Sequence, residues 1–322
     1  MRAKNINTVN ISGRIYQHDL ELKTVKNQQS ANFGKPFIGG KLEIAVDEAG
    51  LEVIPVTFTY VTEKTSKGGT NKTYTELLNI IQNGKTILTD GIEAATKVNI
   101  DTVTDLNDFP AQDGTMVSTQ IFNGGFVTIV SELKPENERT AFKADMVITN
   151  IGHVDANPDA FIDADYVTVR GVIFNFRNAI LPVEFVVKNP LGMQYFEGLD
   201  VSNANPLFTQ VWGNLNFTTK KAQRTEESAF GGPAVTTFSR KVKEWVITGA
   251  KSVPYDFGDE AVMTMEDLIK ASQDREVHLA EIKKRRDEYM AASAAATPTA
   301  FASTPTPSVP TPAAAPTSGW SF

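Results

Sequence analysis

The sequence predicts a mainly β protein, with two small Greek-key β-barrels in tandem followed by an α-helix and a disordered C-terminal tail. Three observations predict it. A short pattern of alternating apolar residues around a glycine occurs twice, at 9–16 and at 167–174. From 263 to 292 the composition becomes helical, with mixed charges and neither glycine nor proline. After 292 no residue is charged, and Ala, Thr, Pro and Ser dominate.

The repeated pattern indicates a bent barrel strand. In both copies apolar residues occupy every second position, which is the period of a strand with one buried face. A central glycine, Gly13 in the first copy and Gly171 in the second, is typical of a bend or bulge where a barrel turns a corner. Bent strands of this kind favour the OB-fold, a Greek-key barrel that often binds oligonucleotides. We therefore expect two OB-like domains.

Residues 1–155 are expected to form the first OB-like domain, which is acidic and carries inserted loops. Its candidate strands are rich in Val, Ile, Thr and Phe and are separated by Gly, Asn, Asp or Pro. They span 7–16, 41–46, 51–61, 97–103, 126–131 and 143–151.

One helix is predicted inside this first domain, at 74–82. Its apolar residues recur at helical spacing, and Asn83-Gly84 follows as a stop signal. A helix between the third and fourth strands agrees with the OB order of elements. The polar, turn-rich stretch 107–123 is expected to form a surface loop or a hairpin extension.

Residues 164–254 are expected to form the second OB-like domain, which is net basic. No convincing helix interrupts it, so a β-sandwich stays open as an alternative. Turn residues separate its candidate strands, which span 166–176, 180–187, 194–201, 206–219 and 240–251.

The C-terminal part is expected to be a helix at 263–292 and a disordered tail at 293–322. The helix has a weak apolar stripe, which suits packing on the barrels or extension into solvent. The tail cannot bury enough apolar surface to offset the entropy of ordering it. Trp320 and Phe322 form an aromatic tip, and such a tip can enter a pocket of a partner protein. The alternative is a passive spacer.

The charge pattern separates the middle of the chain from its flanks. The net charge of −7 argues against a nucleic-acid-binding protein. However, residues 166–251 carry 10 basic and 6 acidic groups, whereas 1–165 carry 15 and 22, and 252–292 carry 6 and 10. Only the middle block is positive, so a nucleic-acid surface is expected there if one exists.

Composition also bears on the compartment. The chain has no cysteine, which excludes disulfides and fits a reducing compartment. No run approaches the roughly 20 apolar residues that span a bilayer, and the N-terminus has no hydrophobic signal segment. We therefore expect a cytoplasmic protein with no membrane partner.

Signatures of an enzyme are weak, and the sequence predicts neither catalysis nor a cofactor. The segment 83–86, Asn-Gly-Lys-Thr, resembles the end of a P-loop, but the apolar helix precedes it instead of following it. The three histidines are scattered, so a metal site or a catalytic triad on them has no support from spacing. An acidic linker surface is the preferred interpretation of four nearby carboxylates, Asp155, Asp159, Asp163 and Asp165.

Aromatic and basic residues on the outward faces of the predicted strands form the candidate site. Single strands can be held by bases that stack on exposed rings while Lys and Arg follow the backbone. The candidate residues are Arg14, Tyr16, Arg170, Phe174, Phe176, Arg177, Phe208, Trp212, Lys220 and Lys221.

Trp212 is the strongest candidate, because it falls on the polar face of its strand and two lysines follow shortly after. The alternative is that it covers a seam between the two domains. Phe58 and Tyr60 share a face with Ile54 and are expected in the core. Trp245 is expected to be buried, since its strand is apolar on both faces.

The chain resembles the single-stranded DNA-binding proteins of bacteria and bacteriophages. Asn7-Thr-Val-Asn-Ile-Ser-Gly-Arg-Ile-Tyr16 looks like the opening strand of that family. The segments 40–46 and 56–60 and the helix at 74–82 follow in its order, and a long arm ending in Phe is also a feature of the family. Two departures are that the tip has no acidic residue and that two modules share one chain. A tandem, divergent form suits a bacteriophage, whose host cytoplasm would then hold the protein.

The predicted function is to coat and protect single-stranded DNA during replication or recombination, without enzymatic activity. The expected partners are single-stranded DNA and, at the aromatic tip, replication or recombination proteins; a homo-oligomer stays open. The alternatives are a structural virion β-sandwich protein, which would explain the acidity, and a carbohydrate-binding module, because aromatic platforms also stack on sugars. Lysines near Trp212 favour phosphates over neutral glycans.

Overall fold

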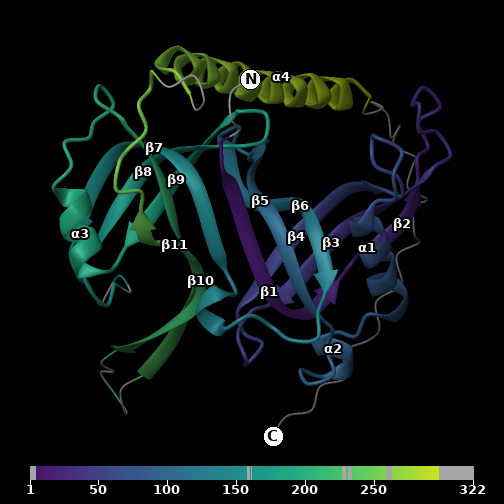
Figure 1. The fold of residues 1–322 in the computed structure, drawn as a ribbon, viewed down its shortest axis with the longest axis horizontal. Coiled ribbons are helices and arrows are strands. Elements are labelled where there is room, and N and C mark those ends of the chain that lie inside the picture. The colour runs from purple at the N-terminus through teal and green to yellow at the C-terminus, as the bar shows by residue number, and fades with distance from the viewer. Residues whose placement is uncertain are drawn as a thin grey trace, which may run out of the picture.

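The computed structural model describes residues 5–157, 160, 162–226, 230, 234–258 and 263–296, with the backbone alone at 218–226, 234–241 and 292–296. In this part of the chain, 11 strands form one continuous sheet. Two additional pairings, β1 with β3 and β7 with β10, close the sheet into two rings (Figure 1). The prediction of a mainly β protein built on two barrels is confirmed.

The first ring has five strands in the order β1-β3-β4-β6-β5, with β5 pairing back to β1. Only the β4–β6 contact is parallel, which is the arrangement of an OB-fold. A short strand, β2, extends the sheet beyond β3. The strands are β1 (Asn7–His18), β2 (Glu21–Thr24), β3 (Pro36–Ala45), β4 (Val53–Thr62), β5 (Lys97–Pro110) and β6 (Met116–Ile129).

A helix lies between β4 and β5, as the sequence predicts. It is α1 (Lys72–Asn83), and a single further turn, α2 (Ile87–Asp90), follows it. The Asn71 side chain caps α1 by accepting a hydrogen bond from the Thr73 backbone N–H, and Leu77 and Ile80 are buried against the ring. The polar stretch at 107–123 forms the β5–β6 hairpin, so the hairpin extension is confirmed.

The second ring repeats the same order, β7-β8-β9-β11-β10, with β10 pairing back to β7. Again a single contact, β9–β11, is parallel. A short 3₁₀ turn, η1 (Glu136–Glu138), precedes it. The strands are β7 (Ala141–Val154), β8 (Tyr166–Phe174), β9 (Ile180–Val187), β10 (Leu207–Glu226) and β11 (Ala234–Ala250).

The expectation that no helix interrupts the second ring is wrong. The helix α3 (Pro190–Glu197) lies between β9 and β10, where a strand at 194–201 was expected. Asn189 caps it by accepting from the Leu191 and Gly192 backbone N–H groups, and Pro190 occupies its first turn. Because Phe196 packs into the core, one buried contact and these caps suffice for a helix of two turns.

The strand β7 pairs with both rings. It hydrogen-bonds to β8 and β10 over most of its length and to β1 at Asn7, Thr8 and Val9. Segment 143–151 was expected in the first domain, and the Gly171 pattern was expected to be the counterpart of the Gly13 pattern. In ring order, however, the counterpart of β1 is β7, and Gly171 belongs to the following strand, β8. We therefore propose a domain boundary near residue 140.

Apolar side chains of both rings form one buried cluster. Trp245 lies in it and stacks on Phe185 at 5.2 Å between ring centroids. It also contacts Phe122 of the first ring, at 5.9 Å, so its predicted burial is confirmed. The two rings therefore share a core as well as a sheet.

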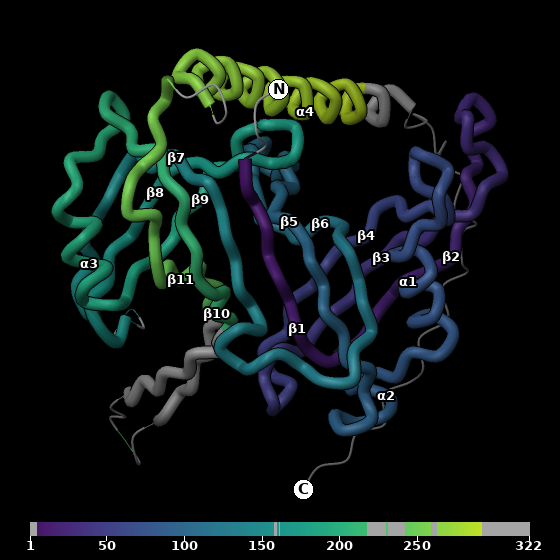
Figure 2. The backbone as a smooth tube through the Cα atoms, viewed as in Figure 1, coloured from purple at the N-terminus to yellow at the C-terminus, as the bar shows by residue number. Residues whose placement is uncertain are grey.

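The long helix α4 (Met265–Ala296) crosses one end of both rings (Figures 1 and 2). It confirms the helix predicted from 263 to 292. Thr264 caps it, because its side-chain oxygen accepts from the Asp267 backbone N–H while Asp267 accepts from the Thr264 N–H. Among the described residues, no helix is long and apolar enough to cross a membrane.

Candidate nucleic-acid interface

A groove of about 710 Å³ runs between the two rings, and we name it the aromatic groove. Two exposed aromatic side chains line it, Phe126 from β6 and Trp212 from β10, with exposed fractions of 73% and 38%. Its other polar and charged lining residues are Thr8, Asn10, Asp101, Thr102, Asn137, Glu138, Lys143, Asn214 and Thr248. Exposed rings that face one groove from two barrels are an arrangement on which bases can stack.

Trp212 owes its position to two glycines. The register of β10 and β11 shifts between Trp212 and Gly213, which is a β-bulge. A Cβ on Gly249 would meet the Trp212 ring at 2.6 Å, so the indole lies directly over the backbone at this position. The ring is therefore held in place on one side and open to solvent on the other.

Phe126 is a candidate site residue that sequence reasoning missed. It follows Gly124 and Gly125, whose φ angles of +68° and +124° few other residues adopt. The register of β5 and β6 also shifts here, between Asp101 and Val103. This bulge turns Phe126 outward, and the Gly-Gly pair before an aromatic residue was the signal that could have identified it.

Charges around the aromatic groove are balanced. Lys143 is exposed directly opposite Trp212 in the β7–β10 pairing, and the Lys134 ammonium donates to the Asn10 side chain. Asp101 also accepts from Asn10. The groove thus offers stacking rings, amides and two cations, but it lacks a strongly positive field.

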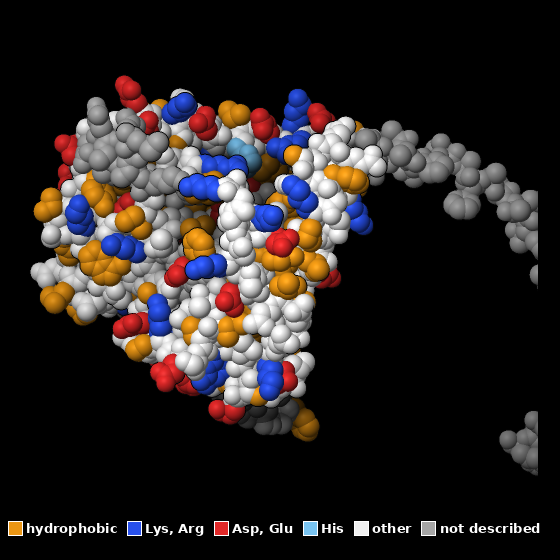
Figure 3. All heavy atoms as spheres, turned by 45° about the vertical axis from the view of Figure 1, so that its right-hand side comes forward, with side chains coloured by type: hydrophobic (Ala, Val, Ile, Leu, Met, Phe, Trp, Pro, Cys, Tyr) orange, Lys and Arg blue, Asp and Glu red, His pale blue; other side chains and the backbone are white. Residues whose placement is uncertain are grey.

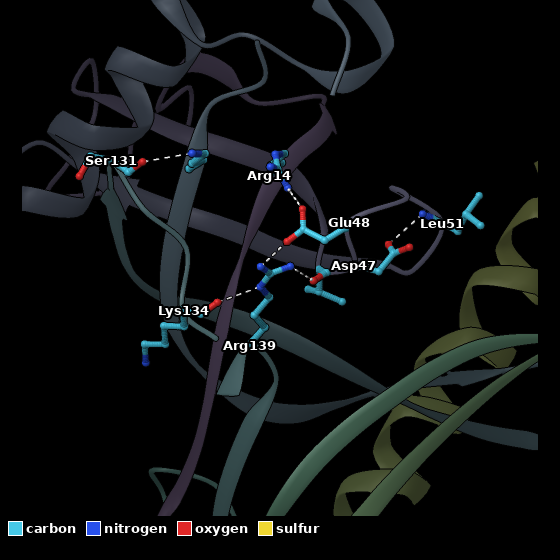
Figure 4. Close-up of polar contacts among 9 residues, drawn as sticks. Arg14, Asp47, Glu48, Leu51, Ser131, Lys134 and Arg139 are labelled. Atoms are coloured by element: carbon cyan, nitrogen blue, oxygen red, sulfur yellow. Dashed lines mark hydrogen bonds and ion pairs between the residues drawn. The ribbon is translucent and has the colours of Figure 1, made fainter. Parts of the chain in front are cut away.

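Arg14 is used inside the protein. Its guanidinium forms an ion pair with Glu48 at 2.9 Å and is only 11% exposed (Figure 4). Arg139 binds the other carboxylate oxygen of Glu48 and also donates to the backbone oxygens of Val46 and Lys134. Hydrogen bonds from Arg139, then from Arg14, hold the pKa of Glu48 below its ordinary value. This network fastens the β3–β4 turn to β1.

Two of the predicted site residues line other cavities. Tyr16 is half-buried in a cavity of about 430 Å³ between β1, the β3–β4 turn and the β10–β11 pair. Arg170 lines a cavity of about 860 Å³ and forms an ion pair with Glu184 at 2.5 Å. The structure therefore places neither of them beside Trp212.

Phe174 and Phe208 were expected to face outward, and the structure buries both. They form an edge-to-face pair at 6.1 Å, within a second, smaller core that also contains Met263. Tyr255 and Phe257 pack on Phe208 from the segment that follows β11. This segment covers a strand face that sequence alternation alone marks as exposed.

Phe176 and Arg177 lie together on the exposed β8–β9 turn. The Arg177 guanidinium lies 5.0 Å above the Phe176 ring, a cation–π contact. Neither residue lines the aromatic groove. The core position expected for Tyr60 is wrong, since this residue is 45% exposed and packs on Phe37, near the start of β3. Phe58 is buried as predicted.

Lys220 and Lys221 lie in the β10 arm of the β10–β11 hairpin, and their side chains are outside the described part of the structure. In the register Lys220 faces Arg240, and Lys221 faces Ser239. The segments 217–225 and 235–241 contain five basic residues and no acidic one; we name them the basic hairpin.

Trp320 and Phe322 lie outside the described residues, as does Asp159 of the acidic linker. Within the described residues, one exposed group places three potential metal ligands together, His153, Asp155 and Asp165. His153 is already paired with Glu197 at 2.6 Å, and this hydrogen bond raises the pKa of its imidazole.

The fold and the groove define a class of protein, a tandem OB-fold whose two rings are joined by one sheet and share one open groove. The chain belongs to the YorF family, whose model matches residues 5–285. No curated protein matches the sequence.

Solved structures of a single-stranded DNA-binding protein from Thermus aquaticus are similar to this chain. The wild-type protein is 10% identical, with a TM-score of 0.46, and the match covers 79% of this chain and 96% of that chain. A deletion mutant of the same protein is 11% identical, with a TM-score of 0.45, and the match covers 80% and 98%.

Proposed function

We propose that this protein binds single-stranded DNA, with bases stacked in the aromatic groove and phosphates along the basic hairpin. The observation that carries this proposal is that Phe126 and Trp212 come from separate rings and face the same groove. Each base stacked on an aromatic side chain contributes about 1–3 kcal/mol, and stacking does not depend on base identity. Trp212 precedes the basic hairpin on the same β-strand, so one DNA strand can make both the stacking and the phosphate contacts.

The finer role proposed is to coat and protect single-stranded DNA during replication or recombination, without catalysis. Amide side chains of the groove support it, because they can donate to or accept from any base edge. The aromatic tip would bind replication or recombination proteins. Encoding by a bacteriophage and a place in the host cytoplasm belong to the same proposal.

The test is fluorescence anisotropy of a labelled thymine oligonucleotide of about 30 bases, long enough to cross both rings. We expect binding that weakens steeply with salt, and a matching duplex should bind much more weakly. Phe126→Ala and Trp212→Ala should each weaken binding by about 5- to 150-fold, the equivalent of one lost stack. Tyr289→Ala is the matched control, since this ring is exposed on α4, far along the chain from the groove.

A carbohydrate-binding module is the second candidate, because Asn and Thr side chains dominate the polar lining of the groove. Sugars would bind without salt dependence and would also need Trp212. No binding of the oligonucleotide even at low salt would reject DNA binding and favour the structural virion role.

A further inference from the structure

Lys243 of β11 is a cation without a carboxylate partner in the described part of the chain. Its ammonium lies 4.8 Å from the ring centroid of Phe122 and 5.4 Å from that of Phe217. Its one hydrogen bond runs to the backbone oxygen of Gln120, at 3.5 Å. Desolvation by the surrounding protein lowers the pKa of Lys243 to about 8. The side chain as a whole is nevertheless exposed, so an anion from solution can reach the ammonium and offset its partial desolvation.

This ammonium lies where two cavities meet. Lys243 lines both the 430 Å³ cavity with Tyr16 and the 860 Å³ cavity with Arg170. The larger cavity also receives Arg275 from α4, and Ser118 and Gln120 from β6. Lys and Arg side chains gather around a hollow on the face shown in Figure 3. Because Lys243 lines both cavities, they are neighbours, and a polymer could contact both at once.

The other cations of the larger cavity are already neutralised. Arg170 pairs with Glu184 and Arg275 pairs with Asp108. In the described part of the chain, Lys243 is thus the cation at the junction that forms no ion pair, although Glu43 and Glu52 line the smaller cavity with it. An ammonium with three donors binds phosphate oxygens well without demanding a fixed geometry. The aromatic rings of Tyr16 and Phe217, on the other side of Lys243, add surfaces on which a neighbouring base can stack.

We propose that the junction of these two cavities is a second contact site for single-stranded DNA, in which Lys243 binds a backbone phosphate and Tyr16 and Phe217 receive the adjacent base. This inference rests on the proposed function, and it adds a path on the β8–β9 side of the second ring. Both the DNA backbone and free inorganic phosphate would offer Lys243 a phosphate group, so the experiment must distinguish these two ligands.

The experiment compares oligonucleotide affinity over a series of salt concentrations for the wild type, Lys243→Gln and Lys243→Arg. One lost phosphate contact should reduce the magnitude of the slope of log affinity against log salt by about 0.7 for Lys243→Gln. Lys243→Arg should keep the wild-type slope. Lys72→Gln is the matched control, because Lys72 is exposed on α1 and lines neither cavity.

The outcomes separate this inference from the function on which it rests. An unchanged slope for Lys243→Gln, while Trp212→Ala still weakens binding, would overturn the second site alone. No binding by the wild type would overturn both. Inorganic phosphate at constant ionic strength should displace little oligonucleotide. If phosphate instead reduces the wild-type salt slope to that of Lys243→Gln, the site binds free phosphate and the backbone contact is rejected.

Discussion

Arg275 of α4 donates to both carboxylate oxygens of Asp108 of β5, at 3.0 and 3.2 Å, although 167 residues separate the two. The exposed fractions of the two side chains are 12% and 5%, and Arg275 also donates to the Ser118 hydroxyl. Leu268, near the start of the same helix, packs against the smaller core of the second ring. This ion pair therefore fastens α4, whose start packs on the second ring, to the β5–β6 hairpin of the first.

Arg275→Met should release α4 from the first ring. Removing one partner of a buried ion pair costs about 3–5 kcal/mol, because the other charge stays buried without compensation. Hydrogen exchange should show lower protection of the α4 amides, while the strands keep theirs. Arg285→Met is the control, since Arg285 forms only an exposed contact with Glu281 and should change the free energy of unfolding by less than about 0.5 kcal/mol. Equal losses in both variants would contradict this role.

Acid should undock α4 before the barrels unfold. Burial alone would raise the pKa of Asp108, but hydrogen bonds from Arg275 and Ser118 outweigh it and hold the pKa below its ordinary value. Because the pKa is lower in the folded state, the stabilisation is complete above the unfolded pKa of about 3.9 and is lost as pH falls through the folded pKa. Pepsin digestion between about pH 5 and pH 2 should cut α4 first. Asp108→Asn should remove this pH step.

Lys243→Met should stabilise the protein at neutral pH, and only modestly, because the Lys243 side chain is exposed and water screens its charge. The pKa of Lys243 is about 8 in the folded state, against about 10.4 when unfolded. The unfolded state binds more protons in this interval, so the free energy of unfolding of the wild type should rise with pH between about 8 and 10.4. Glu43, Glu52, Arg170, Glu184 and Arg275 line the same two cavities and are kept in both variants.

Urea unfolding at neutral pH and near pH 10 measures this difference. The gain from Lys243→Met should shrink at the higher pH, where the wild-type amine is neutral. If the increase in the free energy of unfolding is independent of pH, side-chain packing and not the charge of Lys243 causes the increase. Lys72→Met should show no gain at either pH.

Gly171→Ala should destabilise the second ring. A Cβ at Gly171 would lie 2.0 Å from the backbone oxygen of Val147, where the register of β7 and β8 shifts. Forcing the strands apart costs about 1–3 kcal/mol or more. Gly69→Ala is the control, because its Cβ would meet only the Thr65 hydroxyl, at 3.6 Å. Thermal unfolding of both variants tests the prediction, and similar midpoints would refute it.

Much of the fold could be predicted from local patterns. Val9, Ile11 and Ile15 alternate along β1 and are all buried, and the helix near Leu77 is marked by its spacing and its stop signal. Which strand belongs to which ring could not be predicted, because Gly13 and Gly171 are required for the same local reason. In each strand a neighbouring backbone carbonyl comes too close for a Cβ. Such a close approach occurs at any bend of a barrel, so a glycine does not identify which strand of the barrel bends.

The candidate site was less predictable than the fold. Trp212 could be identified because strand alternation put it on a polar face. Phe174 and Phe208 satisfied the same rule, but a later segment that contains Tyr255, Phe257 and Met263 covers them. Phe126 depends on a bulge at Gly124 and Gly125 that alternation does not reveal. Alternation identifies two faces of a strand, while tertiary packing decides which face stays open.

The strand β7 makes the two rings one mechanical body, because its backbone hydrogen-bonds to β1 on one side and to β8 and β10 on the other. Cutting the chain near residue 140 would leave an unpaired edge on β1, where intermolecular pairing begins. The distance between Phe126 of the first β-ring and Trp212 of the second is then fixed by the fold. If the protein binds single-stranded DNA across both β-rings, the binding-site size should be a fixed number of nucleotides at every protein concentration.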